Sequence, residues 1–427
     1  MPKNNPRGEF LDEIDAYLDD WDAAKKKYVK IKAESVSDAL QALFPKIDDA
    51  REQFDLDEVN RLLEEFEEQD DNLTDDLAPV FYLRGLNYTL QLRHEDAKLY
   101  FRKASSLDDK NSLYKNDHAI ILSKLGRHEE AEPIFRRALE INEAVYGTDH
   151  RSVPILLNIL ATALQNQGKY AQAEPLFRRA LELSEKQRDP AHPRLAVSLK
   201  NMAGLLLDVG KQQEAEALYR RTLAIDEKVY DNEHPKLAID LNNLAESMRM
   251  QGKHDEAEPH YRRSLAITEK AYGKEHPEVV TGLNNLAESL RTQKKYDEAE
   301  QLYRQTLALC EKHLGPEHSF VAGSLNNLGL LLHEKKKYTE AEPLFRRALS
   351  IDEMAFGKDH PNVALDLNNL AQLLQEQGKF HDAVPLYQQA LKILDSRLGE
   401  AHPQTIAILK NFAAFTKTFG NANDNKK

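Results

Sequence analysis

Histidine and asparagine side chains recur along this chain at a fixed spacing, and both could carry chemistry. Seven histidines stand 42 residues apart: His150, His192, His234, His276, His318, His360 and His402. Imidazole often binds metals, but copies of a repeated helix pair lie roughly 10 Å or more apart, whereas zinc holds its ligands at about 2.0–2.1 Å. The histidines therefore cannot share one ion. Because a proline follows five of them, we expect each to mark the start of a helix, and we predict no metal and no cofactor.

Two adjacent columns of asparagine follow the same period. One column holds Asn116, Asn158, Lys200, Asn242, Asn284, Asn326, Asn368 and Lys410, and the next holds Asn201, Asn243, Asn285, Asn327, Asn369 and Asn411. Asparagine is unfavourable inside a helix because its amide competes for backbone groups. At about 100° per residue the second column points away from the apolar side of its helix. It would then line the concave face of a stacked array, while the first column lies near the neighbouring repeat.

These amides allow two interpretations. An amide offers a donor and an acceptor, which suits the backbone of an extended peptide. The alternative is a hydrogen-bond ladder between repeats that only stiffens the array. We favour contact with a partner for the second column and the ladder for the first.

The repeated unit that positions these residues is a pair of antiparallel helices. In residues 234–273, Pro235 suits the first position of a helix and Gly273 the residue just past a helix end. One apolar face runs through each helix, and only stacked neighbours can bury it. A column of small residues and a column of rings predict close helix packing: Ala131, Ala173, Ala215, Ala257, Ala299, Ala341 and Ala383, each followed four residues later by Phe or Tyr.

Composition excludes several other classes of function. Residues 1–78 hold 23 acidic and 10 basic side chains, which accounts for the whole net charge of −13. The balanced repeats lack the clustered positive charge of a nucleic-acid binder. A single cysteine, Cys310, excludes a disulfide framework and fits a reducing compartment. With no apolar run long enough to cross a membrane and no leader pattern, we predict a cytoplasmic protein. Signature motifs of common enzymes are absent too.

The small and large columns resemble the tetratricopeptide repeat (TPR). An earlier unit in residues 78–108 matches the usual 34-residue form of that repeat, with Gly85, Tyr88, Ala97, Phe101 and Ala104. The longer unit, with LNNLA in its first helix, EAEPLFRRAL in its second and YGKEHP between units, resembles the kinesin light chain branch. In that family, asparagines of this motif line a groove and hold peptides of the cargo. The resemblance therefore implies the same role for Asn201, Asn243, Asn285, Asn327, Asn369 and Asn411.

Two arginines are further candidates for binding a partner. Arg249 and Arg291 could receive a carboxylate, because guanidinium binds it through two hydrogen bonds. However, Glu246 and Glu288 stand three residues before them and could pair with them instead. Arginines four residues after a glutamate, such as Arg262 after Glu258, are more simply surface ion pairs.

The acidic N-terminal segment carries a different pattern. Apolar and aromatic residues between 10 and 31 recur in steps of four and three, which predicts a helix that docks or self-associates. Leu18, Trp21 and Asp22 also resemble the tryptophan-plus-acidic peptides that kinesin light chains bind. They are candidates for docking into the groove of this chain or a sister chain. The simpler alternative is that this helix caps the first repeats.

We therefore predict an all-α, right-handed superhelical TPR solenoid. Its parts are an acidic helix in residues 1–35, a helical region in 36–108, the 42-residue array with a capping helix in 109–420, and a disordered tail in 421–427. The predicted function is a non-catalytic adaptor that binds an extended peptide of a protein partner in the concave groove. The alternative is a structural scaffold or assembly factor that contacts a folded partner or filament.

Overall fold

A computed structural model describes residues 26–29, 31–32, 38–68, 74–186, 193–400 and 402–424 of the chain. Within these residues the secondary structure is helical and contains no strand. The chain divides into two compact units, residues 12–231 and residues 232–427, which we call the N-terminal and C-terminal units. None of the described helices combines the length and the apolar character needed to cross a membrane.

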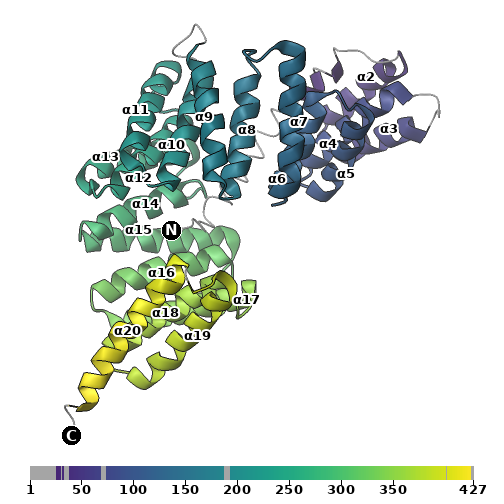
Figure 1. Cartoon of the computed structure of the whole chain (residues 1–427). Helices are drawn as coiled ribbons and strands as arrows, with labels where there is room; N and C mark the ends of the chain where they lie inside the picture. Colours follow the sequence, from purple (N-terminus) through teal and green to yellow (C-terminus); the bar gives the residue numbers. More distant parts are fainter. Residues whose placement is uncertain are drawn as a thin grey trace. The chain divides into compact units, whose positions relative to one another are not determined.

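The N-terminal unit contains helices that pack as consecutive antiparallel pairs (Figure 1). The pairs are α2 with α3, α4 with α5, α6 with α7, α8 with α9, and α10 with α11. Their bounds are α2 Asp38–Glu52, α3 Leu56–Glu68, α4 Thr74–Leu90, α5 His94–Leu107, α6 Ser112–Lys124, α7 His128–Tyr146, α8 Val153–Asn166, α9 Tyr170–Glu185, α10 Pro193–Asp208 and α11 Gln212–Val229.

The C-terminal unit continues the same pairing and ends in one unpaired helix. Its helices are α12 Pro235–Met250, α13 His254–Tyr272, α14 Val279–Thr292, α15 Tyr296–Leu314, α16 Ser319–Glu334, α17 Tyr338–Phe356, α18 Pro361–Glu376, α19 Phe380–Leu398 and α20 Pro403–Asp424. Helix α20 ends at Asp424, within the stretch 421–427 for which the sequence predicts a disordered tail.

Close packing of small residues against rings holds each pair together, as the sequence predicted. The alanine column of the second helices is fully buried, and so are nearly all of the rings four residues later. At Gly329 of α16 an added Cβ would lie 2.7 Å from Cε1 of Phe345 in α17, and at Gly85 of α4 it would lie 2.6 Å from Cδ1 of Phe101 in α5. The ring of the second helix therefore packs directly on the glycine of the first helix and leaves no room for a Cβ.

The turns between helices use left-handed backbone at fixed positions. Gly273 ends α13 with φ at 94°, a region that glycine enters without steric cost. In the turns between first and second helices, other units carry a glycine such as Gly252 with φ at 77°, but two units carry a lysine with positive φ, Lys294 at 61° and Lys336 at 59°. The repeat keeps its backbone geometry even where the residue is unfavourable.

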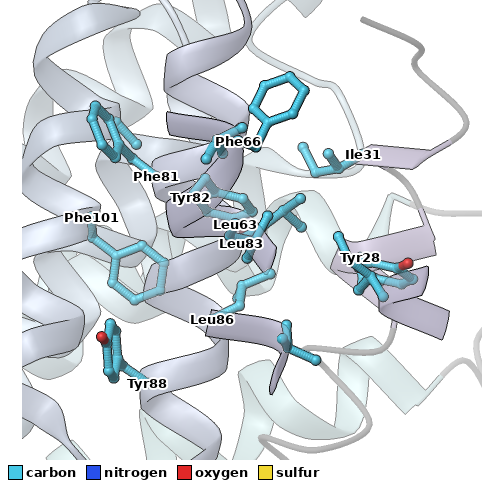
Figure 2. Close-up of a cluster of buried hydrophobic side chains, with 14 of the residues drawn as sticks. Tyr28, Ile31, Leu63, Phe66, Phe81, Tyr82, Leu83, Leu86, Tyr88 and Phe101 are labelled. Carbon is cyan, nitrogen blue, oxygen red and sulfur yellow. The ribbon is translucent and has the colours of Figure 1, made fainter. Parts of the chain in front are cut away.

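Aromatic side chains build the core of the first helices of the N-terminal unit. Tyr28 and Ile31 are buried in the same cluster as Phe66 and Tyr82 (Figure 2). Tyr28 also donates a hydrogen bond to Asp48 Oδ1 at 2.7 Å. The last residues of the predicted docking segment thus pack onto this chain's own helices.

Candidate partner-binding surface

The histidine column marks helix starts, as predicted. Nδ1 of His234 accepts the backbone N–H of Lys236, two residues into α12, at 3.2 Å. Nδ1 of His318 and His360 accepts in the same way at α16 and α18. His192 lies outside the described residues. Among the described residues no group of three or more histidine, cysteine or acidic side chains is arranged to hold a metal.

Three members of the second asparagine column bond to the preceding repeat. Asn285 Nδ2 donates to Asn242 Oδ1 at 2.8 Å, and Asn327 Nδ2 donates to Asn284 Oδ1 at 2.7 Å. The third bond, from Asn411 to Asn368, has a length of 3.0 Å. Each bond joins residues 43 positions apart, so second-column donors meet first-column acceptors. We call these three bonds the asparagine ladder.

The other three members of that column are not in the ladder. The side chains of Asn201, Asn243 and Asn369 are half-buried on first helices, and they make no hydrogen bond to any residue that the structure describes. Asn326, the first-column residue before Asn369, donates its Nδ2 to Asp366, and its Oδ1 accepts no hydrogen bond from a described residue. The six predicted site residues therefore split into three used inside the array and three available for a partner.

Arg249 and Arg291 are both engaged within the C-terminal unit. Two hydrogen bonds of 2.8 Å join Arg249 to Glu246, and two of 3.0 and 2.8 Å join Arg291 to Glu288. Tyr303 donates to the same Glu288 carboxylate at 2.8 Å. Burial alone would raise the pKa of Glu288, but its hydrogen bonds with Arg291 and Tyr303 hold that pKa below its usual value. A carboxylate of a partner would have to displace these internal partners.

The outward-facing ion pairs form as predicted and also cross between repeats. Glu258 Oε1 lies 2.8 Å from Arg262 Nη2, and its Oε2 lies 2.6 Å from Lys295 Nζ of the next repeat. Burial alone would raise the pKa of Glu258, but the hydrogen bonds from Lys295 and Arg262 lower it. Glu132 and Glu342 repeat this arrangement with Lys169 and Lys379. The arginines that follow a glutamate by four residues are therefore engaged in ion pairs, and they do not form a phosphate-binding stripe.

An apolar cavity of about 610 Å³ lies on the first helices of the N-terminal unit. Most of its wall comes from α6, α8 and α10, with further residues from α7 and α9. The residues of the first helices include Ile120, Ile155, Ile159, Val197, Asn158 and Asn201. Ile155 is 41% exposed and Val197 46% exposed, so this part of the surface offers apolar groups to solvent. The cavity thus brings one asparagine from each column together with exposed aliphatic side chains.

Asn158 is the most constrained polar group of this cavity. Its side chain is 6% exposed, and its Nδ2 donates to Ser198 Oγ at 3.0 Å. Its Oδ1 is buried and has no hydrogen-bond partner, which is costly for an amide carbonyl. Asn158 belongs to the first column, for which the sequence predicts a ladder, but no ladder bond forms at this repeat.

Sequence reasoning did not find the cavity itself. The signal was present at position 159, where Ile159 replaces the asparagine that the second column carries in every later unit. Together with Ile155 and Val197, it makes the cavity wall on α8 and α10 apolar. The cavity thus arises where this unit departs from the average repeat.

The candidate self-docking residues Leu18, Trp21 and Asp22 lie outside the described residues. The nearest described contact is the ion pair of Lys27 Nζ with Asp117 Oδ2 at 2.7 Å. Asp117 belongs to α6 and is 2% exposed. The chain therefore reaches the helix that lines the cavity shortly after the candidate segment.

Known structures with this arrangement of helices are numerous. One is the structure of TPR-like repeats, nearly identical to each other, from a Podosopora anserina protein named as a kinesin light chain. It is 26% identical to this chain, covers 48% of this chain and 98% of that chain, and gives a TM-score of 0.44. BtubC (BKLC) from P. vanneervenii is 25% identical over 56% of this chain and 93% of that chain, with a TM-score of 0.46. The quorum sensor NprR from B. thuringiensis matches 80% of this chain and 99% of its own, with 17% identity and a TM-score of 0.57. NprR shares the fold alone at this identity.

Comparison of the sequence with models of protein families assigns the chain to a family. No curated protein matches the chain. The tetratricopeptide repeat matches residues 152–228, 236–312 and 320–396, which together exceed half of the chain. Further tetratricopeptide repeat matches fall on residues 114–152 and 202–259. The predicted all-α solenoid of helix pairs is therefore confirmed, and the chain belongs to the tetratricopeptide repeat family, whose fold serves interactions between proteins.

Proposed function

We propose that the N-terminal unit binds an extended segment of a protein partner along the first helices α6, α8 and α10. The cavity there has the apolar walls and the few polar groups that are typical of ligand sites. Filling it with one aliphatic or aromatic side chain would contribute about 1.5–3 kcal/mol through burial of apolar surface. The proposal makes the chain an adaptor that holds a peptide and performs no chemistry on it.

The buried carbonyl of Asn158 carries this proposal. Its unpaired Oδ1 needs a donor, and the backbone N–H of an extended peptide supplies one. Leaving such a group unpaired costs about 1–3 kcal/mol, and a partner that pairs it removes that cost. Asn201 lies in the wall of the same cavity with a half-buried amide that can donate and accept.

A selection of linear peptides on the full chain tests the proposal. Peptides that bind the wild type should lose affinity for the Val197→Asp variant, since a carboxylate would then stand in the apolar wall. Val145→Asp is the matched control, because Val145 is 63% exposed and does not line the cavity. Equal binding to the wild type and both variants would refute this location of the site.

A structural scaffold is the second candidate function, and the asparagine ladder favours it. Asn285, Asn327 and Asn411 use their amides to join neighbouring repeats, which suits a stiff surface for a folded partner. The two functions belong to different units and can be separated. If selected peptides bind elsewhere or not at all, while removal of ladder amides weakens capture of a folded partner, the scaffold is the better assignment.

We also propose that Leu18, Trp21 and Asp22 compete for the cavity in the N-terminal unit. Trp21 precedes Lys27 by six residues, which span at most about 20 Å when extended, and Lys27 contacts α6. Deleting residues 1–22 should then raise the affinity for selected peptides. An unchanged or lower affinity would contradict this competition and favour the alternative that the N-terminal helix caps the first repeats. A cytoplasmic location and the lack of nucleic-acid binding stay predictions from composition.

A further inference from the structure

Two buried aspartates face each other between consecutive repeats of the C-terminal unit. Asp352 of α17 is 6% exposed and Asp366 of α18 is 2% exposed. Their carboxyl groups are within hydrogen-bonding reach of one another. Asn326 of α16 donates to Asp366 Oδ1, whereas Asp352 Oδ1 and Asp366 Oδ2 have no partner if both groups are ionised. A proton on either carboxyl would give the pair a hydrogen bond.

The fold does not require carboxyl groups at these two positions. Equivalent positions in other repeats hold uncharged pairs: Ser184 with Ser198, Cys310 with Ser324, and Leu394 with Ile408. The serine hydroxyls lie 2.9 Å apart, and Ser324 Oγ lies 3.5 Å from Cys310 Sγ. The sequence carries the aspartates once more, at the buried Asp226 and Asp240. The acidic pair is therefore an addition to the repeat and not part of its packing.

Two carboxylates in contact away from water cannot both ionise without a large cost. Burial, together with the neighbouring Asp352, raises the pKa of Asp366 to about 8, and burial raises the pKa of Asp352 to about 6. Among the described helices packed around the pair, α16 contributes only the neutral amide of Asn326. No cation from α16, α17, α18 or α19 acts on either carboxyl. The two groups therefore titrate as a pair.

We propose that Asp352 and Asp366 form a proton-operated latch between two repeats. With one proton held between them, the carboxyl groups join α17 to α18. When that proton passes to solvent, two adjacent negative charges repel each other and the boundary between the repeats opens more often. A surface that spans this boundary then responds to pH, whichever partner the N-terminal unit binds.

The direction of the pH response follows from the number of bound protons. In the opened form both carboxyls meet water and titrate near the usual value for aspartate, about 4. Between about pH 6 and about pH 8 the closed form therefore holds one proton that the opened form has lost. Opening should increase up to about tenfold for each unit of pH in this range, and it should level off above it.

Hydrogen exchange of the full chain, measured on the backbone amides of α17 and α18 from about pH 6 to about pH 9, tests the latch. The Asp366→Asn variant keeps the shape of the side chain but cannot ionise, and comparison at each pH removes the intrinsic pH dependence of exchange. The wild type should open increasingly more than the variant as pH rises. Asp395→Asn, at an exposed position of α19, should follow the wild type.

A second variant keeps the proposal testable if Asp366→Asn does not fold. Asp352→Ser with Asp366→Ser introduces the uncharged pair found at Ser184 and Ser198, and it should abolish the pH response as Asp366→Asn does. A constant ratio between the wild type and both variants across the range would overturn the proposal. So would a boundary that stays closed at high pH only when calcium is present and opens on adding EDTA, because the oxygens would then hold a cation and not a proton.

Discussion

The asparagine ladder can be tested by a matched pair of substitutions in one column. Asn285 and Asn369 occupy equivalent positions, midway along α14 and midway along α18, and both side chains are half-buried. Asn285 donates to Asn242 at 2.8 Å, whereas Asn369 makes no hydrogen bond to a described residue. The Asn285→Ala and Asn369→Ala variants therefore differ mainly in the loss of one inter-repeat bond.

The magnitude follows from two opposing contributions. Alanine is the better helix former by about 0.5 kcal/mol, which favours both variants. Asn285→Ala also loses a hydrogen bond worth about 1 kcal/mol, and water can reach the half-buried Asn242 that it leaves. We expect Asn285→Ala to lower the free energy of unfolding by about 0.5 kcal/mol and Asn369→Ala to raise it by about the same amount.

Urea denaturation of the full chain measures this difference of about 1 kcal/mol. Because repeat arrays can unfold in steps, the slopes of the two variants must agree before their midpoints are compared. Neither change should alter peptide binding at the cavity of the N-terminal unit. If Asn285→Ala is as stable as Asn369→Ala, the ladder contributes nothing to stability and our account of these amides is wrong.

Three further predictions concern packing, backbone and charge. Lys336→Gly should stabilise the chain by about 1 kcal/mol in the same denaturation assay, since glycine adopts the left-handed turn without strain. Gly329→Ala should destabilise it by about 1 kcal/mol despite the better helix propensity of alanine, because the new Cβ meets the buried Phe345 ring. A hydrogen bond from Lys379 lowers the pKa of Glu342 to about 2. Stability from this pair is present above the usual glutamate value and is lost as pH falls toward about 2. Between about pH 5 and about pH 2 the wild type should therefore lose on the order of 1 kcal/mol more than Glu342→Gln, and equal losses would contradict this.

Periodicity was sufficient to predict the local structure of each repeat. The spacing of Pro235 and Gly273 located the ends of a helix pair, and the columns of alanine and rings identified the packed face. The ion pair of Glu258 with Arg262 followed from their separation of four residues. All of these features depend on contacts within one helix or one helix pair, which the sequence of a single unit specifies.

Contacts between repeats were harder to predict. The helical angle placed Asn285 on the concave side, but it could not show how far one unit is rotated against the next. That rotation brings Asn285 to Asn242, 43 residues earlier, and so the donor comes from one column and the acceptor from the other. The sequence did not predict the pairing of Asp352 with Asp366 for the same reason, because the two residues belong to different repeats.

The ladder bonds also bear on how such a chain can change length during evolution. Each bond crosses a single boundary, and every complete unit that follows the consensus brings its own donor and its own acceptor. Duplicating or deleting one whole unit by recombination would therefore leave the number of unpaired amides unchanged. An insertion of any other size would separate donors from acceptors, so selection should tolerate gains and losses only in multiples of 42 residues.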